Sequence, residues 1–233
     1  MFLQNKCLVS SCNKVSLSSF DENGNILELR NYCLDHIPNP GKAKEDIFNF
    51  IKNNDTIVVL NASGILFSDL DFSNKRFYGC NFTNCTFTNI HSSNFRSRMS
   101  IFDFAIFNDC NIVESKIQFS SFSGCTLNHT LFTSSEIIQS NYNGVKCFQS
   151  SFDDSDLFNS KFIKSTLVNT SFRNCNLKNT DFFTSERSNV SFKMSNTRES
   201  RFSRDGSELY TGIESTDSVS DTKPSEPAMG GEK

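Results

Sequence analysis

The chain has 233 residues, a hydrophobic content of 36% and a formal net charge of −3. This balance gives no overall electrostatic signature of nucleic-acid binding, and no run of 18 apolar residues is present that would span a membrane. Nine cysteines without an N-terminal signal-peptide pattern favour reduced thiols and predict a cytoplasmic protein.

Residues 1–38 contain a candidate metal site. Cys7, Cys12, Cys33 and His36 form the pattern C-x4-C-x20-C-x2-H. Three thiolates and an imidazole are good ligands for Zn²⁺, and four protein ligands close a tetrahedral structural site. The pattern therefore predicts a structural zinc ion, and the alternative is a set of unligated structural or surface cysteines.

The residues between the two ligand pairs predict a hairpin. Residues 14–20 alternate like a strand, residues 21–25 are typical of a turn, and residues 26–32 are expected to form the returning strand. A hairpin that joins two ligand pairs resembles small zinc-ribbon or treble-clef modules. A segment this short buries too little surface to fold without a staple, so we expect the metal to hold a module with its own separate core.

A short amphipathic helix is predicted within residues 39–66. Ile47, Phe50 and Ile51 fall on one face of this helix. Together with the apolar segment 57–60, the helix is expected to cap the structure that follows, because the open end of a stack of strands recruits further strands.

A five-residue repeat covers residues 67–202. Every fifth residue from Phe67 gives 28 positions, of which 15 are Phe and seven are Leu or Ile. The residue two positions earlier is small, since all 21 such residues from Ser100 to Ser200 are Ser, Thr, Cys, Ala or Val. Neither a helix nor an ordinary strand spaces large and small residues in this way. A square coil does, because each five-residue side directs one large and one small side chain to the axis.

Residues 20 apart are expected to stack on one side of this coil, in parallel strands about 4.8 Å apart. The repeat predicts a rod of about seven coils, with five cysteines packed in the small inward position. One ladder is aromatic throughout, and its burial and ring stacking are the expected source of stability. Its members are Phe82, Phe102, Phe122, Tyr142, Phe162, Phe182 and Phe202.

The repeat resembles the motif of the pentapeptide-repeat family, in which a small residue precedes Asp or Asn, Leu or Phe, and two polar residues. The segments CNFTN at 80–84, SDLFN at 155–159, CNLKN at 175–179 and TDFFT at 180–184 fit this motif closely. The residue before the central one is Asp or Asn in eight of 28 repeats, a looser match than many members show. The resemblance implies an all-β fold, a right-handed quadrilateral parallel β-helix, and says little about function.

The repeat falters between residues 90 and 99. Two central positions there are serine, and Arg96 and Arg98 lie close together. Either the coil is distorted and Phe95 substitutes for a central residue, or a loop leaves the wall. Because loops on rigid scaffolds often carry function, His91, Arg96 and Arg98 are candidate partner-binding residues; solvated arginines on an imperfect repeat are the alternative.

The remaining sequence points to binding rather than catalysis. Residues 203–233 are acidic and aperiodic, and are expected to be disordered. No nucleophile elbow, phosphate-binding glycine loop or dinucleotide fingerprint is present. We therefore predict a non-enzymatic scaffold that presents a rigid surface to a macromolecular partner, with protein favoured over nucleic acid.

Two alternatives have specific requirements. Quinolone-resistance members of the family resemble duplex DNA in shape and charge and act on DNA gyrase, which needs a strongly acidic rod. Residues 67–202 carry 14 Lys and Arg against 12 Asp and Glu. The other alternative is a zinc-dependent nucleic-acid-binding or enzymatic accessory module. Residues 1–66 carry six basic and seven acidic residues, which gives no basic patch, and four protein ligands leave the metal no open position.

The charge balance leads to one biochemical prediction. Purified protein is expected not to inhibit gyrase supercoiling at low micromolar concentration, because the rod lacks the acidic excess of a DNA mimic. Potent inhibition in a supercoiling assay would show that local clustering of charge outweighs this balance.

Overall fold

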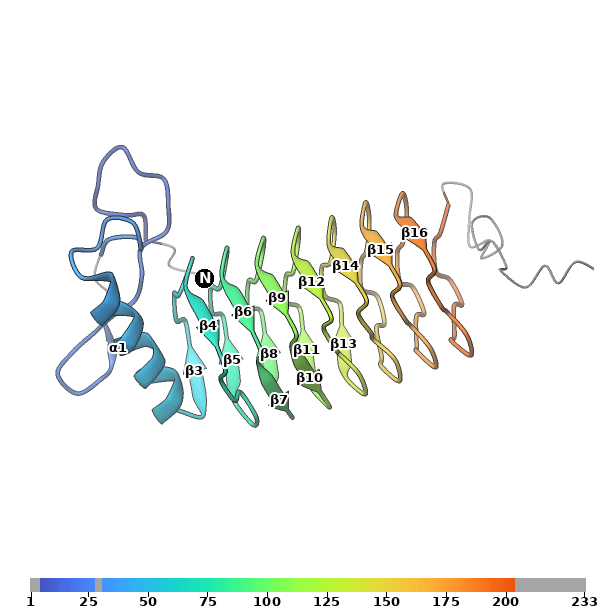
Figure 1. Ribbon diagram of the computed structural model, residues 1–233, viewed down its shortest axis with the longest axis horizontal. Coiled ribbons are helices and arrows are strands. Elements are labelled where there is room, and N and C mark those ends of the chain that lie inside the picture. Colours follow the sequence, from blue (N-terminus) through green and yellow to red (C-terminus); the bar gives the residue numbers. More distant parts are fainter. Residues whose placement is uncertain (1–4, 28–30, 204–233) are drawn as a thin grey trace, which may run out of the picture.

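The computed structural model describes residues 5–27 and 31–203, so the tail predicted to be disordered lies outside the described residues apart from Ser203. Figure 1 shows a long stack of coils with the N-terminal segment and helix α1 gathered at one end. Among the described residues, no helix has both the length and the apolar composition that crossing a membrane requires.

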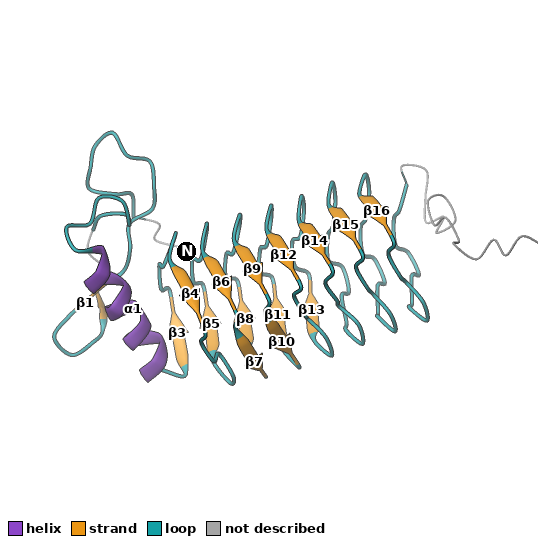
Figure 2. Cartoon of the chain, viewed as in Figure 1, coloured by secondary structure: helices purple, strands orange, loops and turns teal. Residues whose placement is uncertain are grey.

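Each coil has four sides, and residues 20 apart lie in register on neighbouring coils. We call the sides faces A, B, C and D, centred in the first full coil on Phe67, Phe72, Phe77 and Phe82. The predicted parallel β-helix is thereby confirmed. Figure 2 shows the strands of successive coils lying side by side along the rod.

The strands are short because each side of the square is short. Face A contains β4 (Leu66–Ser68), β6 (Thr86–Thr88), β9 (Ile106–Asn108), β12 (Thr126–Asn128), β14 (Lys146–Phe148), β15 (Thr166–Val168) and β16 (Glu186–Ser188). Face C contains β3 (Thr56–Val58), β5 (Arg76–Tyr78), β8 (Arg96–Arg98), β11 (Lys116–Gln118) and β13 (Glu136–Ile138). Face B contains β7 (His91–Ser93) and β10 (Asn111–Val113), and face D is held by single parallel bridges such as Asn61 to Asn81.

The corners of the coil explain the five-residue period. Every fifth residue from Val59 to Glu199 has a positive φ, as at Asn74 (62°) and Gly124 (66°). Only this left-handed conformation turns the chain at the end of each side, and Gly, Asn and Asp adopt it at the lowest cost. These three residue types occupy 16 of the 29 corners.

The predicted aromatic ladder forms the core of face D. Its seven members are all buried, neighbouring ring centroids lie 4.6–5.1 Å apart, and neighbouring ring planes are within 13° of parallel. The cysteines of the small inward position are also buried, and burial raises the pKa of Cys80 and Cys85 to about 12. These thiols are therefore packing residues and stay protonated.

One member of this ladder carries a polar atom with no partner. The Tyr142 side chain is fully buried, and its hydroxyl has no hydrogen-bond partner among the described residues. A buried hydroxyl without a partner costs free energy. Tyr142→Phe is therefore expected to stabilise the rod by about 1 kcal/mol, measured by denaturant unfolding. A loss of stability in this variant would show that the hydroxyl is satisfied in solution.

The coil does not break between residues 90 and 99. β7 and β8 stay in register with the coils on either side, so of the two alternatives the coil with Phe95 substituting for a central residue is confirmed and the loop is excluded. Phe95 stands in the small inward position with its ring centroid 5.4 Å from that of Phe77, while Ser92 and Ser97 point inward at the central positions. Large and small residues have exchanged places in this coil.

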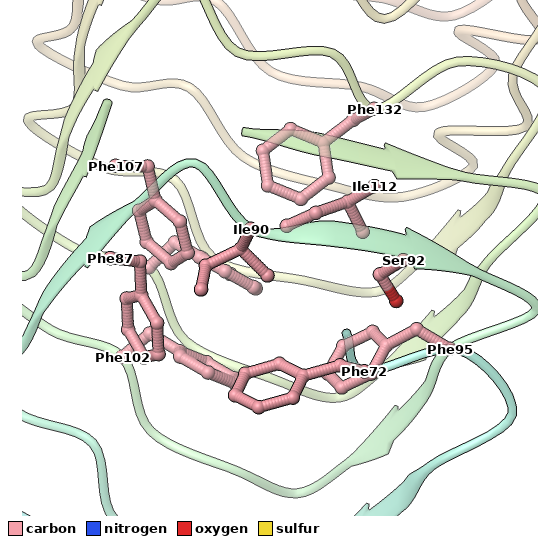
Figure 3. A pocket seen from close by; sticks show the side chains of 10 residues that line it. Phe72, Phe87, Ile90, Ser92, Phe95, Phe102, Phe107, Ile112 and Phe132 are labelled. Atoms are coloured by element: carbon pink, nitrogen blue, oxygen red, sulfur yellow. The ribbon is translucent and has the colours of Figure 1, made fainter. Parts of the chain in front are cut away.

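The exchange leaves a small cavity beside Ser92, shown in Figure 3. Its volume is about 20 Å³ and its other lining side chains are apolar. The Ser92 hydroxyl points into this space without a hydrogen-bond partner among the described residues. The cavity is large enough for one water molecule and too small for an organic ligand.

Helix α1 (Pro40–Asn53) covers the N-terminal end of the stack. The Asn39 side chain accepts a hydrogen bond from the backbone amide of Lys42 at 3.0 Å and so caps the first turn. Ile47 and Ile51 are buried, and the Phe48 ring lies 5.2 Å from that of Phe67. The helix thus protects the edge at which a further coil would otherwise add.

The predicted capping role of segment 57–60 is wrong, because this segment belongs to the coil itself. β3 pairs in parallel with β5 through Ile57 and Phe77. The wall therefore begins at Thr56, eleven residues before the first position assigned to the repeat. At the same end, the Lys75 Nζ donates to the carbonyls of Lys52 and Asn54 at 3.0 and 2.9 Å and closes the C-terminus of α1.

Candidate metal centre

A hairpin separates the two pairs of candidate ligands, as the sequence predicts. β1 (Ser19–Phe20) pairs antiparallel with β2 (Ile26–Leu27), and residues 28–30, part of the predicted returning strand, lie outside the described residues. The Asp21 carboxylate accepts hydrogen bonds from the backbone amides of Asn23 and Asn25 at 2.9 and 2.8 Å. This Asx turn brings the chain back toward its start.

Backbone hydrogen bonds place each ligand pair in a tight turn. The amide of Cys12 donates to the carbonyl of Val9 at 2.9 Å, and the amide of Cys7 donates to the carbonyl of Lys14 at 2.9 Å. The amide of His36 donates to the carbonyl of Cys33 at 3.1 Å. Both turns direct their side chains to one point.

The four ligand atoms lie close enough together to bind one ion. All are within 4.8 Å of one another, and no other group of three or more His, Cys, Asp and Glu in the described residues comes this close. The Sγ atoms of Cys12 and Cys33 are 3.8 Å apart, and the His36 Nδ1 is 3.4 Å from the Sγ atoms of Cys7 and Cys33. Zinc–sulfur bonds of about 2.3 Å and a zinc–nitrogen bond of about 2.0 Å give tetrahedral edges of about 3.8 and 3.5 Å.

The surroundings favour a deprotonated Cys7, whereas burial raises the pKa of Cys33. Burial opposes ionisation of Cys7, but hydrogen bonds from the backbone amides of Cys33 and Val9 and from His36 lower its pKa to about 6. The backbone amide of Lys14 donates to the Cys12 Sγ at 3.4 Å. The thiolate is the form that binds metal, so the cluster can hold a divalent cation.

An ion pair ties the two ligand turns together. The Lys14 ammonium, just after Cys12, contacts the Asp35 carboxylate, which lies between Cys33 and His36. Hydrogen bonding and charge from Asp35 raise the pKa of Lys14, while Lys14 lowers that of Asp35. Both side chains are exposed, so this pair orients the turns more than it stabilises them.

The expected separate core of the N-terminal module is wrong. Leu17 is buried in the same hydrophobic cluster as the coil. Ser18 exchanges two hydrogen bonds with Asn61, at 2.9 Å through its backbone amide and at 2.8 Å through its hydroxyl. The Phe20 ring also lies 4.9 Å from that of Phe50 on α1. The candidate metal centre therefore sits on a segment that packs on the first coil.

The three candidate partner-binding residues do not form one surface. His91 lies on face B, where its Nε2 is 3.1 Å from the Asn89 Oδ1. Arg96 and Arg98 lie on face C, in β8. Equivalent positions on neighbouring faces are five residues apart. His91, five positions before Arg96, therefore points to a different side of the rod.

Comparison with known proteins finds the five-residue repeat in part of the chain. Residues 150–185 match the family model of pentapeptide repeats, in eight copies. Among solved structures, the plasmid-mediated fluoroquinolone resistance protein QnrB1 is 14% identical with a TM-score of 0.33, over 60% of this chain and 81% of that one. HetL, a pentapeptide-repeat protein involved in heterocyst differentiation regulation in the cyanobacterium Nostoc, is 8% identical with a TM-score of 0.27, over 67% and 95% of the two chains. No curated protein matches the sequence.

The described coils and their five-residue unit define a parallel β-helix of the quadrilateral type. The family model matches a five-residue unit. This unit recurs at the same spacing, without a shift, through the whole stack from Ile57 to Phe202. The described residues thus contain a β-helix built from pentapeptide repeats.

Proposed function

We propose that this chain is a non-enzymatic binding protein whose rigid rod presents its outer faces to a protein partner. The observation that supports this proposal is the difference between the inward and the outward positions of each repeat. Inward positions are filled almost without exception by Phe, Leu, Ile and small residues, whereas outward positions differ from face to face. Such a rod keeps its outward side chains at fixed spacings, which lowers the entropic cost of binding.

The second part of the proposal is that Cys7, Cys12, Cys33 and His36 bind one Zn²⁺. The three separations of 3.4, 3.8 and 3.4 Å between ligand atoms support a tetrahedral ion, and four protein ligands leave no position for a substrate. Bound zinc would supply structural cross-linking and no chemistry on another molecule. We also propose a cytoplasmic location, because thiolate ligands and buried thiols suit a reducing compartment.

The binding proposal can be tested with one charge reversal on each face. Each of four variants changes one face by the same two units of charge: Lys146→Glu on face A, Arg173→Glu on face B, Arg96→Glu on face C and Lys161→Glu on face D. Each variant and the unaltered protein are immobilised, exposed to extract from the source cells, and the retained proteins are quantified and then re-tested as purified partners.

A binding rod predicts that one purified partner loses affinity for one of these variants and keeps its affinity for the other three. The proposal would be contradicted if none of the four charge reversals changed which proteins are retained from the extract. It would also be contradicted if no purified candidate partner bound the unaltered protein. Because all four variants carry the same net charge, a general electrostatic effect would weaken all of them equally.

A further inference from the structure

Five corners of the coil carry bulky apolar residues where the backbone favours Asn or Gly. Val59, Met99, Phe104, Phe119 and Met194 all have a positive φ, between 53° and 63°. Bulky and β-branched side chains are strained in this conformation. All five are exposed, from 43% at Phe119 to 80% at Met194, so their burial within the chain does not offset the strain.

Three of these residues follow one edge of the rod. Val59, Met99 and Phe119 belong to the corner between faces C and D, in coils that contain β3, β8 and β11. Gly79 occupies the same corner in the coil between those of Val59 and Met99, and it adds no side chain to this column. This corner is an apolar stripe that runs along the rod axis.

A column of cations runs beside this stripe on face C. Arg76, Arg96 and Lys116 are consecutive partners in the parallel register. Like charges in adjacent strand positions repel one another. Lys116 is paired with Glu136 at 3.0 Å, whereas no carboxylate among the described residues forms an ion pair with Arg76 or Arg96.

The two features share the same coils. Met99 follows Arg96 by three positions, and Phe119 follows Lys116 by three. The Arg98 guanidinium lies 5.6 Å from the centre of the Phe119 ring and joins the basic column to the apolar stripe. Both the strained corners and the repelling cations are disadvantages for the isolated rod, and one acidic, apolar partner would compensate for both.

From this juxtaposition we propose that face C and its corner with face D bind an acidic amphipathic helix of a partner protein. A helix rises about 5.4 Å per turn, close to the spacing of about 4.8 Å between coils, so a stripe of carboxylates and a stripe of leucines can follow the two columns together. Of the three stripe residues, Val59 and Met99 are aliphatic and only Phe119 offers a ring on which a nucleic-acid base could stack, which favours a protein partner. This inference rests on the proposed binding function and specifies its surface.

The test uses fluorescence anisotropy with a labelled helical peptide of about 20 residues that has Glu and Leu stripes on one face and Ala elsewhere. We expect salt-dependent binding to the full chain that weakens at least about tenfold in Arg96→Glu. We expect a similar loss in the double variant Met99→Asn/Phe119→Asn, which places the preferred corner residue at both sites and so preserves folding. Circular dichroism and thermal melting confirm the fold of each variant.

Matched controls make the same changes elsewhere. Lys161→Glu on face D and Phe104→Asn at another corner are expected to bind the peptide like the unaltered protein. Equal weakening in variants and controls, no binding of the peptide, or tighter binding of a single-stranded or duplex oligonucleotide would overturn the inference. If the peptide fails while a purified partner responds to a reversal on another face, the proposed function stands and this surface does not.

Discussion

Phe162→Ala is expected to lower the free energy of unfolding by about 3–5 kcal/mol. Phe162 is fully buried, and its ring centroid lies 4.9 Å from that of Tyr142 and 5.1 Å from that of Phe182. Its removal leaves a cavity in a wall that neighbouring coils cannot collapse to fill, because each coil is fixed by hydrogen bonds to the next. Denaturant unfolding followed by circular dichroism measures the change.

The control for this prediction is Ile163→Ala, one position along the chain. Ile163 points outward and is only partly buried, so its truncation is expected to cost less than about 1 kcal/mol. Similar costs at the two positions would contradict the inward and outward assignment of the repeat.

Cys33→Ser is expected to abolish metal binding and to unfold the N-terminal segment. The substitution leaves three ligands for an ion whose apparent contribution to folding in small zinc peptides is on the order of 10 kcal/mol. Because Ser18 pairs with Asn61 and Leu17 lies in the shared core, loss of the ion is also expected to loosen the first coil. Hydrogen exchange read by mass spectrometry should show faster exchange at residues 7–36 and 56–62.

Cys110→Ser is the matched control, because serine is the commonest residue at the small inward position that Cys110 occupies. This variant is expected to retain the metal and to exchange like the unaltered protein. Unchanged exchange in the N-terminal segment of the Cys33→Ser variant would argue that the cluster does not hold the segment together.

Most of the rod is predictable from the sequence because its period is unusual. The pattern places a large residue, such as Phe82, every five positions and a small residue two positions before it. Few other folds are compatible with this spacing. The corners can also be predicted from the sequence, because Asn, Asp or Gly follows many central residues by two positions, as Asn84 follows Phe82. That placement marks the left-handed turns directly.

Other features depend on contacts that periodicity does not encode. The coil starts at Thr56 because Ile57 and Ala62 fill inward positions, but the small Ala62 separates Ile57 from the run of large residues that begins at Phe67. The N-terminal segment shares the core because Leu17 reaches the first coil, which its local pattern does not reveal. The cluster of ligands was predictable from residue type, whereas grouping His91 with Arg96 and Arg98 as candidate partner-binding residues does not account for the change of face every five residues.

The coil between residues 90 and 99 shows how far the pattern tolerates exchange. Phe95 supplies volume from the small position, so Ser97 can occupy the central one without breaking the register. Sequence alone left both a distorted coil and a loop open, since both explain serine at central positions. Packing decides between them, because Phe95 meets Phe77 inside the wall.

The account of a rod whose N-terminal segment is fixed by a metal is tested most directly by elemental analysis of protein purified without chelators. It predicts one zinc ion per chain, retained through gel filtration and lost in the Cys33→Ser variant. Zinc well below one equivalent in the unaltered protein, or full retention in that variant, would contradict it.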